Sequence, residues 1–151
     1  MHNFKYLILA TIFLLFNGVN SYADDATFFS CPKSPNCVST EVDAKDNIHY
    51  IAPFNTIDSS EATWNMIRET VLKLPRTKIV EEKNFYFKAE VTSLVLRFVD
   101  DLEVYFCPET KTLSVRSASR VGYSDFGVNR ERVEDFRKSL NDQNILSSKP
   151  G

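Results

Sequence analysis

The hydrophobic pattern of the chain first becomes regular after residue 58. Four apolar residues follow one another at spacings of three and four positions: Trp64, Ile67, Val71 and Leu74. That spacing places them on one face of a helix, and the sequence predicts that this face packs against a core. Asp58 and Glu61 form the pattern of a capping box, which predicts where the helix begins, and Pro75 ends it.

The period of the pattern changes to two in the middle of the chain. Apolar and polar positions alternate in four runs, at residues 85–91, 94–99, 101–106 and 113–116. Ile79 and Val80 indicate one more strand, and residues 108–111 form a turn between two of the runs. Short connections between alternating runs are typical of an antiparallel meander with one buried face.

A second helical face near the C-terminus completes the predicted fold. Val133, Phe136 and Leu140 recur with helical spacing, and Asn129 before them is a favourable N-cap residue. The sequence therefore predicts an α+β fold in which an antiparallel sheet of four or five strands carries two main helices on one face. Aromatic side chains at buried positions are the ordinary content of such a core, and an apolar ligand cavity is the alternative.

The N-terminus is typical of an export signal. Lys5 precedes an apolar run at residues 6–16, and Ser21 and Ala23 place small residues where a signal peptidase reads the chain. The run is shorter than the roughly 20 residues that a membrane span needs. We therefore predict that residues 1–23 are a signal peptide cleaved after Ala23, and that the mature chain is a soluble periplasmic protein without a transmembrane segment.

Length and charge bound the mature protein further. Residues 24–146 suit a single globular domain, and residues 147–151 are predicted to be a disordered tail. The formal net charge of the chain is −2, and loss of Lys5 with the signal makes the mature chain more negative. This balance gives no general attraction to nucleic acid or to anionic membranes. Because His2 is also removed, His49 is the one histidine left, and we predict no metal site and no cofactor.

Three cysteines are available for pairing in the exported chain. Cys31 and Cys37 flank the turn-forming residues 32–36, and such a loop can bring its two ends together. An exported location permits disulfides, so we predict a bridge between these two cysteines, with Cys107 left over. The alternatives are a reactive Cys37 thiol, activated by His49 or by an arginine, and a zinc site.

One polar segment, residues 116–132, joins the last predicted strand to the last helix and contains four arginines; we call it the Arg-rich segment. A helix N-terminus offers free amides and a partial positive charge, and arginine forks bind carboxylates, phosphates and sulfated sugars. The segment therefore predicts a site for an anionic or polar ligand. The predicted ligand-binding residues are Arg116, Ser119, Arg120, Tyr123, Asn129 and Arg130.

An internal network is the alternative role for the same arginines. The predicted supporting carboxylates are Asp100, Asp101, Glu103 and Asp125. If Phe106 pairs with Leu113 across the turn, Glu103 lies opposite Arg116. A shift of two residues would place Asp101 there instead. Arginine–carboxylate pairs of this kind order a long loop without a ligand, although a network that fixes one arginine can also aim another.

Four stretches of the sequence resemble an uncharacterised family. They are Ser-Pro-Asn-Cys-Val-Ser at 34–39, Phe-Val-Asp-Asp at 98–101, Arg-Ser-Ala-Ser-Arg-Val-Gly-Tyr-Ser-Asp at 116–125 and Gly-Val-Asn-Arg at 127–130. On these motifs the chain is identified as a member of domain of unknown function 1499, with a likeness that covers residues 30–141. The resemblance implies that the first and third stretches belong to one domain, where they can meet. It brings no known activity, and because Cys107 matches none of the motifs it favours pairing of the other two cysteines.

These features favour a binding protein over an enzyme. Our leading hypothesis is a non-enzymatic module that binds a small polar, anionic or amphipathic envelope molecule through the Arg-rich segment, in which Asp100 or Asp101 orients an arginine. The first alternative is a hydrolase or a thiol-based enzyme that uses Cys37, although the serines lack the Gly-x-Ser-x-Gly frame of a hydrolase. The second is a structural or partner-binding envelope protein, which a broad apolar surface patch would favour.

Overall fold

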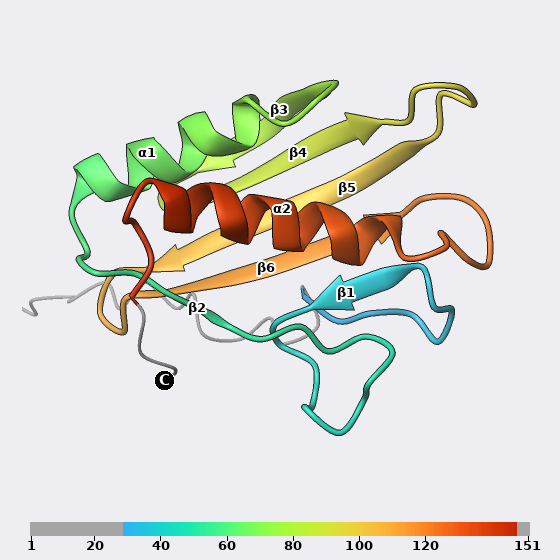
Figure 1. The fold of residues 1–151 in the computed structure, drawn as a ribbon, viewed down its shortest axis with the longest axis horizontal. Helices are drawn as coiled ribbons and strands as arrows, with labels where there is room; N and C mark the ends of the chain where they lie inside the picture. The colour runs from blue at the N-terminus through green and yellow to red at the C-terminus, as the bar shows by residue number, and fades with distance from the viewer. Residues whose placement is uncertain (1–28, 148–151) are drawn as a thin grey trace, which may run out of the picture.

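An antiparallel sheet forms the base of the structure (Figure 1). This computed structural model describes residues 29–147, so the predicted signal peptide and residues 148–151 of the predicted tail lie outside the described chain. The strands follow the order β1-β6-β5-β4-β3, and β2 also pairs with β6. They are β1 (Cys37–Ser39), β2 (Phe54–Asn55), β3 (Thr77–Lys83), β4 (Tyr86–Thr92), β5 (Val99–Cys107) and β6 (Thr112–Ser119).

Two helices, α1 (Glu61–Leu72) and α2 (Val128–Asp142), lie on the same face of the sheet (Figure 1). This arrangement confirms the predicted α+β fold. The sheet has six strands instead of the predicted four or five. The additional strands are β1 and β2, which pair with β6 and are too short to show an alternating hydrophobic pattern. Within residues 29–147, neither helix is long and apolar enough to cross a membrane.

Aromatic side chains fill the space between the helices and the sheet. The ring of Trp64 stacks on that of Phe106 at a centroid distance of 6.2 Å and lies 5.2 Å from that of Phe87. Both phenylalanines are fully buried. On α2, the ring of Phe136 lies 5.8 Å from that of Phe54 of β2. These rings pack on one another, so the aromatic positions of the pattern serve as core.

The first helix begins later than the capping box predicted. Ser60 is the N-cap of α1, and its hydroxyl accepts a hydrogen bond from the Thr63 amide at 3.1 Å. Asp58 accepts from the Ser60 amide instead of the Glu61 amide, so its carboxylate orients the cap and is not the cap itself. The predicted capping box is therefore wrong, and the Thr63 hydroxyl that bonds to Asp58 lowers the pKa of this carboxyl.

The sequence predicted Asn129 as the N-cap of the second helix, but the N-cap is Gly127. Gly127 precedes α2 with a φ of 86°, in the left-handed region that favours glycine. The carboxylate of Asp125 accepts from the amides of Gly127 and Asn129, at 3.1 Å and 2.7 Å. Because Asp125 already satisfies these amides, the Asn129 side chain is released from capping and turns into the protein.

Residues 94–98 connect β4 to β5 and do not form the predicted strand. Thr92 already pairs with Val99, and the Ser93 amide donates to the Phe98 carbonyl at 2.8 Å. The hairpin therefore closes before the intervening residues, and their alternating pattern has nothing to pack against. Within this connection, the most exposed apolar side chains are those of Leu94, Val95 and Leu96, which are 70%, 82% and 67% exposed.

Candidate functional site

The first arginine of the Arg-rich segment pairs with a carboxylate across the sheet. Phe106 lies opposite Leu113, and Glu103 lies opposite Arg116, which is the first of the two registers that the sequence left open. Nη1 of Arg116 is 2.6 Å from Oε2 of Glu103, and its Nε donates to the Ser30 carbonyl at 2.8 Å. The guanidinium group therefore ties the segment before β1 to the sheet.

Arg120 belongs to five charged residues that we call the outer-face network. Its Nη2 lies 2.8 Å from Oδ1 of Asp101 and 2.7 Å from Oε1 of Glu90. Lys88 pairs with Asp101, and Lys78 pairs with Glu90. Burial acts to raise the pKa of Asp101, but hydrogen bonds from Arg120 and Lys88 outweigh it and lower the pKa overall. Hydrogen bonds from Lys78 and Arg120 also lower the pKa of Glu90, so both carboxyls are ionised partners of the basic residues at neutral pH.

Asp100 points to the opposite face from its neighbour Asp101, as side chains along a strand must. Its Oδ2 lies 2.6 Å from Nη2 of Arg132 in α2, and the two side chains are only 10% and 11% exposed. This is a buried ion pair between the sheet and the helix. Asp100 was a predicted site residue, whereas Arg132 was predicted only as one of the four arginines of the segment. The signal available in the sequence was the position of Arg132 three residues after Asn129, on the same side of the helix.

Asn129 is the centre of a hydrogen-bonded cluster beside this ion pair, which we call the Asn129 cluster. Its side chain is fully buried. Its Oδ1 accepts from Oγ of Ser117 and from Nη1 of Arg132, both at 2.6 Å. Its Nδ2 donates to three acceptors, the Asn36 carbonyl at 3.0 Å, Oγ of Ser119 at 2.9 Å and Oδ2 of Asp125 at 2.8 Å.

Asn36, which the sequence analysis did not single out, connects the loop before β1 to the Arg-rich segment. Its Nδ2 donates to the Gly122 carbonyl at 2.7 Å, and its own carbonyl accepts from the Ser119 amide at 2.9 Å. β1 continues this contact, because Cys37 lies opposite Ala118 of β6. The two stretches at 34–39 and 116–125 therefore meet in space.

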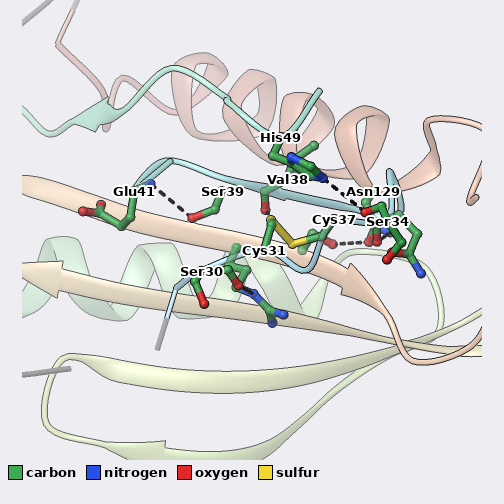
Figure 2. The surroundings of a disulfide bond; sticks show 12 residues. Ser30, Cys31, Ser34, Cys37, Val38, Ser39, Glu41, His49 and Asn129 are labelled. Atoms are coloured by element: carbon green, nitrogen blue, oxygen red, sulfur yellow. Dashed lines mark hydrogen bonds between the residues drawn. A yellow bond between two sulfur atoms is a disulfide. The ribbon is translucent and has the colours of Figure 1, made fainter. Parts of the chain in front are cut away.

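A disulfide closes the loop that carries Asn36. The Sγ atoms of Cys31 and Cys37 are 2.03 Å apart, which confirms the predicted pairing, and Cys107 is free. Figure 2 shows the bridge next to β1, with Asn129 and Ser34 towards the same end of that strand. Cys37 therefore carries no free thiol while the bridge is closed, and a thiol-based enzyme that uses it would first require reduction of the bridge.

His49 fastens the same loop from the other side. Its Nδ1 lies 2.7 Å from Oδ2 of Asp46. Its Nε2 lies 3.2 Å from the carbonyl of Ser34, and both of these residues are drawn in Figure 2. The hydrogen bond to His49 lowers the pKa of Asp46. The histidine therefore has a structural contact on each ring nitrogen.

The motifs that meet at Asn36 are those on which the sequence resembled a known family. A family model described as "Protein of unknown function (DUF1499)" matches residues 28–140. The chain belongs to the DUF1499 family. No curated protein and no solved structure matches it. The predicted resemblance is confirmed, and the family description assigns no activity.

The six predicted ligand residues of this DUF1499 domain differ in how accessible they are. Arg116, Ser119, Arg120 and Asn129 are engaged in the contacts described above. Tyr123 is 76% exposed, and the half-buried Arg130 donates to the Ile48 carbonyl at 3.0 Å. These last two side chains keep surface that a ligand can reach.

Two serines of the Arg-rich segment and the histidine of the DUF1499 domain have separate hydrogen-bond partners. The hydroxyls of Ser117 and Ser119 bond to the Asn129 amide, whereas His49 bonds to Asp46 and to a carbonyl. Among residues 29–147, no group of three or more His, Cys, Asp and Glu side chains is placed to hold a metal ion.

Loss of the disulfide should destabilise the DUF1499 domain without unfolding it. Closure of a loop this short constrains the unfolded chain by about 2 kcal/mol, so Cys31→Ser/Cys37→Ser should lower the free energy of unfolding by about that amount in urea titrations. Cys107→Ser is the control and should have a much smaller effect, because the side chain is half-buried at the end of β5. Three titratable thiols in the oxidised native protein would contradict the pairing.

Proposed function

We propose that this DUF1499 protein is an exported, non-catalytic binding module for an anionic amphiphile of the cell envelope. It contacts the ligand with what we call the loop end of the sheet, formed by the β4–β5 loop (residues 93–98) and the β6–α2 loop (residues 120–127). Both loops leave the sheet at the same end (Figure 1). Next to them, the Arg120 amide donates to the Val99 carbonyl at 3.4 Å. The disulfide supports the exported location.

The gathering of exposed apolar side chains at the loop end carries this proposal. Leu94, Val95, Leu96 and Phe98 are exposed on one loop, and Val121, Tyr123 and Phe126 on the other. Single exposed apolar residues are common on soluble proteins, but a contiguous group of large ones marks a surface that binds something. The proposed ligand therefore has an apolar part.

The polar contacts of the proposal divide the six predicted residues into two roles. Tyr123 and Arg130 contact the ligand, because they retain accessible polar groups beside the apolar loops. Arg116, Ser119, Arg120 and Asn129 hold the Arg-rich segment in place through their internal partners. Because these contacts already order the loop, the loop loses less conformational entropy when a ligand binds. The internal network can therefore favour binding at the adjacent site.

Two measurements test the proposed function. Native mass spectrometry of the protein isolated from its own envelope should show extra mass that leaves on denaturation. Calorimetric titration with monomeric dihexanoyl-phosphatidylglycerol should show binding that Arg130→Gln weakens roughly tenfold, since a charge-assisted hydrogen bond is lost. Arg137→Gln is the matched control: Arg137 also donates to backbone carbonyls, those of Ala52 and Pro53, but further along α2. Equal losses in both variants, or a wild type that binds phosphatidylglycerol neither as monomers nor in vesicles, would refute the proposal.

The same exposed apolar group favours a second candidate function, a partner-binding envelope protein. In that case the native spectrum should contain a stable protein complex or oligomer without bound amphiphile. Leu94→Ser/Leu96→Ser should then dissociate the complex, whereas Arg130→Gln should leave it intact.

A further inference from the structure

We propose that the loop end docks onto the surface of an anionic lipid bilayer. This inference rests on the proposed function and specifies its ligand: the anionic amphiphile is lipid assembled in a membrane and not a single dissolved molecule. The β4–β5 loop would insert its apolar tip, with the β6–α2 loop beside it. The sheet and both helices would remain outside the lipid.

The extent of exposure decides between one small ligand and an extended apolar phase. Val95 at the tip of one loop is 82% exposed, and Phe126 on the other is 97% exposed. Side chains that project this far from two separate loops leave most of their surface in water when a small molecule binds between them. A bilayer can surround such projecting side chains on all sides, because its fluid lipids need no preformed cavity of complementary shape.

The charge at the loop end complements anionic lipid. Arg97 lies between Leu96 and Phe98 at the tip, and within the described chain it has no ion-pair partner, in contrast to Arg120. Arg76, at the same end, donates Nε to the Thr92 carbonyl. At a membrane, a guanidinium group can reach the lipid phosphates while neighbouring apolar side chains enter the acyl region. The β4–β5 loop contains Arg97 and no acidic residue, so it is positively charged in a chain whose net charge is −2.

A protein partner would fit the same tip less readily. It would have to provide a concave apolar cavity and a carboxylate for Arg97 at the correct depth inside it, because burial of an unpaired charge is unfavourable. A bilayer supplies an apolar interior below a layer of anionic groups at every position. The convex tips and the unpaired arginine therefore favour the bilayer.

Phe126 combines an exposed aromatic ring with an unfavourable backbone conformation, a combination that does not stabilise the fold. Its φ of 56° lies in the left-handed region, which is unfavourable for an aromatic residue, and its amide donates to Oγ of Ser124 at 3.3 Å. This backbone presents the ring to solvent. Phe126→Asn should relieve the unfavourable conformation, because asparagine adopts it more readily, and it removes the ring from the surface.

Co-sedimentation with unilamellar vesicles tests the inference on the full chain after expression and purification. The wild type should sediment with vesicles of phosphatidylglycerol and phosphatidylcholine in equal parts and much less with phosphatidylcholine alone. Leu94→Ser/Leu96→Ser should lower the partition coefficient tenfold or more, roughly as expected from two lost apolar side chains. Arg97→Gln should lower binding several-fold and reduce its dependence on salt.

Two further variants separate docking from stability. Phe126→Asn should bind vesicles more weakly while its melting temperature stays equal to that of the wild type or rises. Ile57→Ser should bind as the wild type does: Ile57 is also 54% exposed, but its carbonyl accepts from Lys111, in the turn at the other end of β6. Loss of vesicle binding in Ile57→Ser as large as in Leu94→Ser/Leu96→Ser would overturn the inference.

The outcomes distinguish this inference from the proposed function. If the wild type fails to sediment with the anionic vesicles but binds monomeric dihexanoyl-phosphatidylglycerol, bilayer docking is refuted and the binding module stands. If it binds neither, both are refuted. A stable protein complex that Leu94→Ser/Leu96→Ser dissociates, without vesicle binding, would likewise refute docking and assign the loop end to a protein partner.

Discussion

Replacement of Asn129 by alanine should lower the free energy of unfolding by about 3 kcal/mol. The side chain is fully buried, and its removal leaves the Ser117 hydroxyl, which donates to Oδ1, without its acceptor. It also takes one bond each from Arg132 and from the Asn36 carbonyl, and a buried polar group that loses its partner costs about 1–3 kcal/mol. The small cavity adds to this loss. Urea unfolding followed by circular dichroism measures the change.

Asn129→Asp separates hydrogen bonding from volume. It keeps the shape but replaces the Nδ2 donor by an oxygen that faces the Asn36 carbonyl and the Asp125 carboxylate. We expect a larger loss than with alanine at neutral pH, because two carboxylates then share a buried site. The loss should shrink as the pH falls towards the ordinary aspartate pKa of about 4, since protonation restores a donor.

Asn141→Ala is the matched control for both variants. Asn141 lies on the same helix but is exposed, and surface substitutions of this kind usually change stability by less than about 0.5 kcal/mol. If Asn129→Ala destabilises no more than Asn141→Ala, the Asn129 cluster does not contribute to holding the Arg-rich segment.

The parts of the fold that the sequence could predict are those with a local cause. The helical spacing of Trp64, Ile67 and Val71 predicts a helix with one buried face, whichever strands that face packs against. The turn at 108–111 sets the pairing of the two strands that flank it, so the contact between Glu103 and Arg116 could be predicted from the sequence. The disulfide was predictable for the same reason, because the loop between its cysteines is short and made of turn residues.

The parts that could not be predicted depend on residues distant in the chain. An alternating run such as 94–98 has the same pattern whether a sheet covers it or not, and only the pairing of Thr92 with Val99 leaves it outside the strands. An asparagine before an apolar helical stripe is typical of an N-cap. Asn129 is instead an interior residue, because Asp125 satisfies the helix amides and Asn36 reaches it from far away in the sequence.

The candidate site likewise has a part that could be predicted from the sequence and a part that depends on residues distant in the chain. The four arginines and their carboxylates could be identified by residue type, and the register gave one of the pairs. The register does not determine the partners of the other three arginines. Arg120 meets two carboxylates on the outer face of the sheet, and Arg130 meets the Ile48 carbonyl instead of a carboxylate. Arg132 reaches Asp100 because α2 packs on the sheet with its first turns near the start of β5. The apolar surface of the loop end was not predicted, because residues 94–98 were assigned to a strand and the β6–α2 loop was interpreted from its polar side chains.

The second large effect should come from the ion pair of Arg132 and Asp100. Arg132→Met should lower the free energy of unfolding by about 3–5 kcal/mol, because it leaves the Asp100 carboxylate buried without its cation. Asp100→Leu should also lower the free energy of unfolding, because it leaves the Arg132 guanidinium group without its carboxylate partner. The double variant removes both charges, so its loss should be smaller than the sum of the two single losses by about 1.5–3 kcal/mol. Part of the loss should remain, since Arg132 also bonds to Ser117 and Asn129.

The pair of Lys138 and Asp142 is a matched control on the same helix. Its nitrogen–oxygen distance of 2.7 Å is nearly that of the buried pair, 2.6 Å, but its side chains are 74% and 64% exposed instead of 11% and 10%. Exposed helix pairs contribute about 0.3–0.5 kcal/mol, so the coupling energy of Lys138→Met/Asp142→Leu should be several-fold smaller. Because the two double-mutant cycles differ in burial at nearly equal distance, equal coupling energies would contradict the assignment of Arg132 and Asp100 as a buried pair that fixes α2 on the sheet. A large coupling confined to the buried pair would establish that the last arginine of the segment holds the fold and is not available to a ligand.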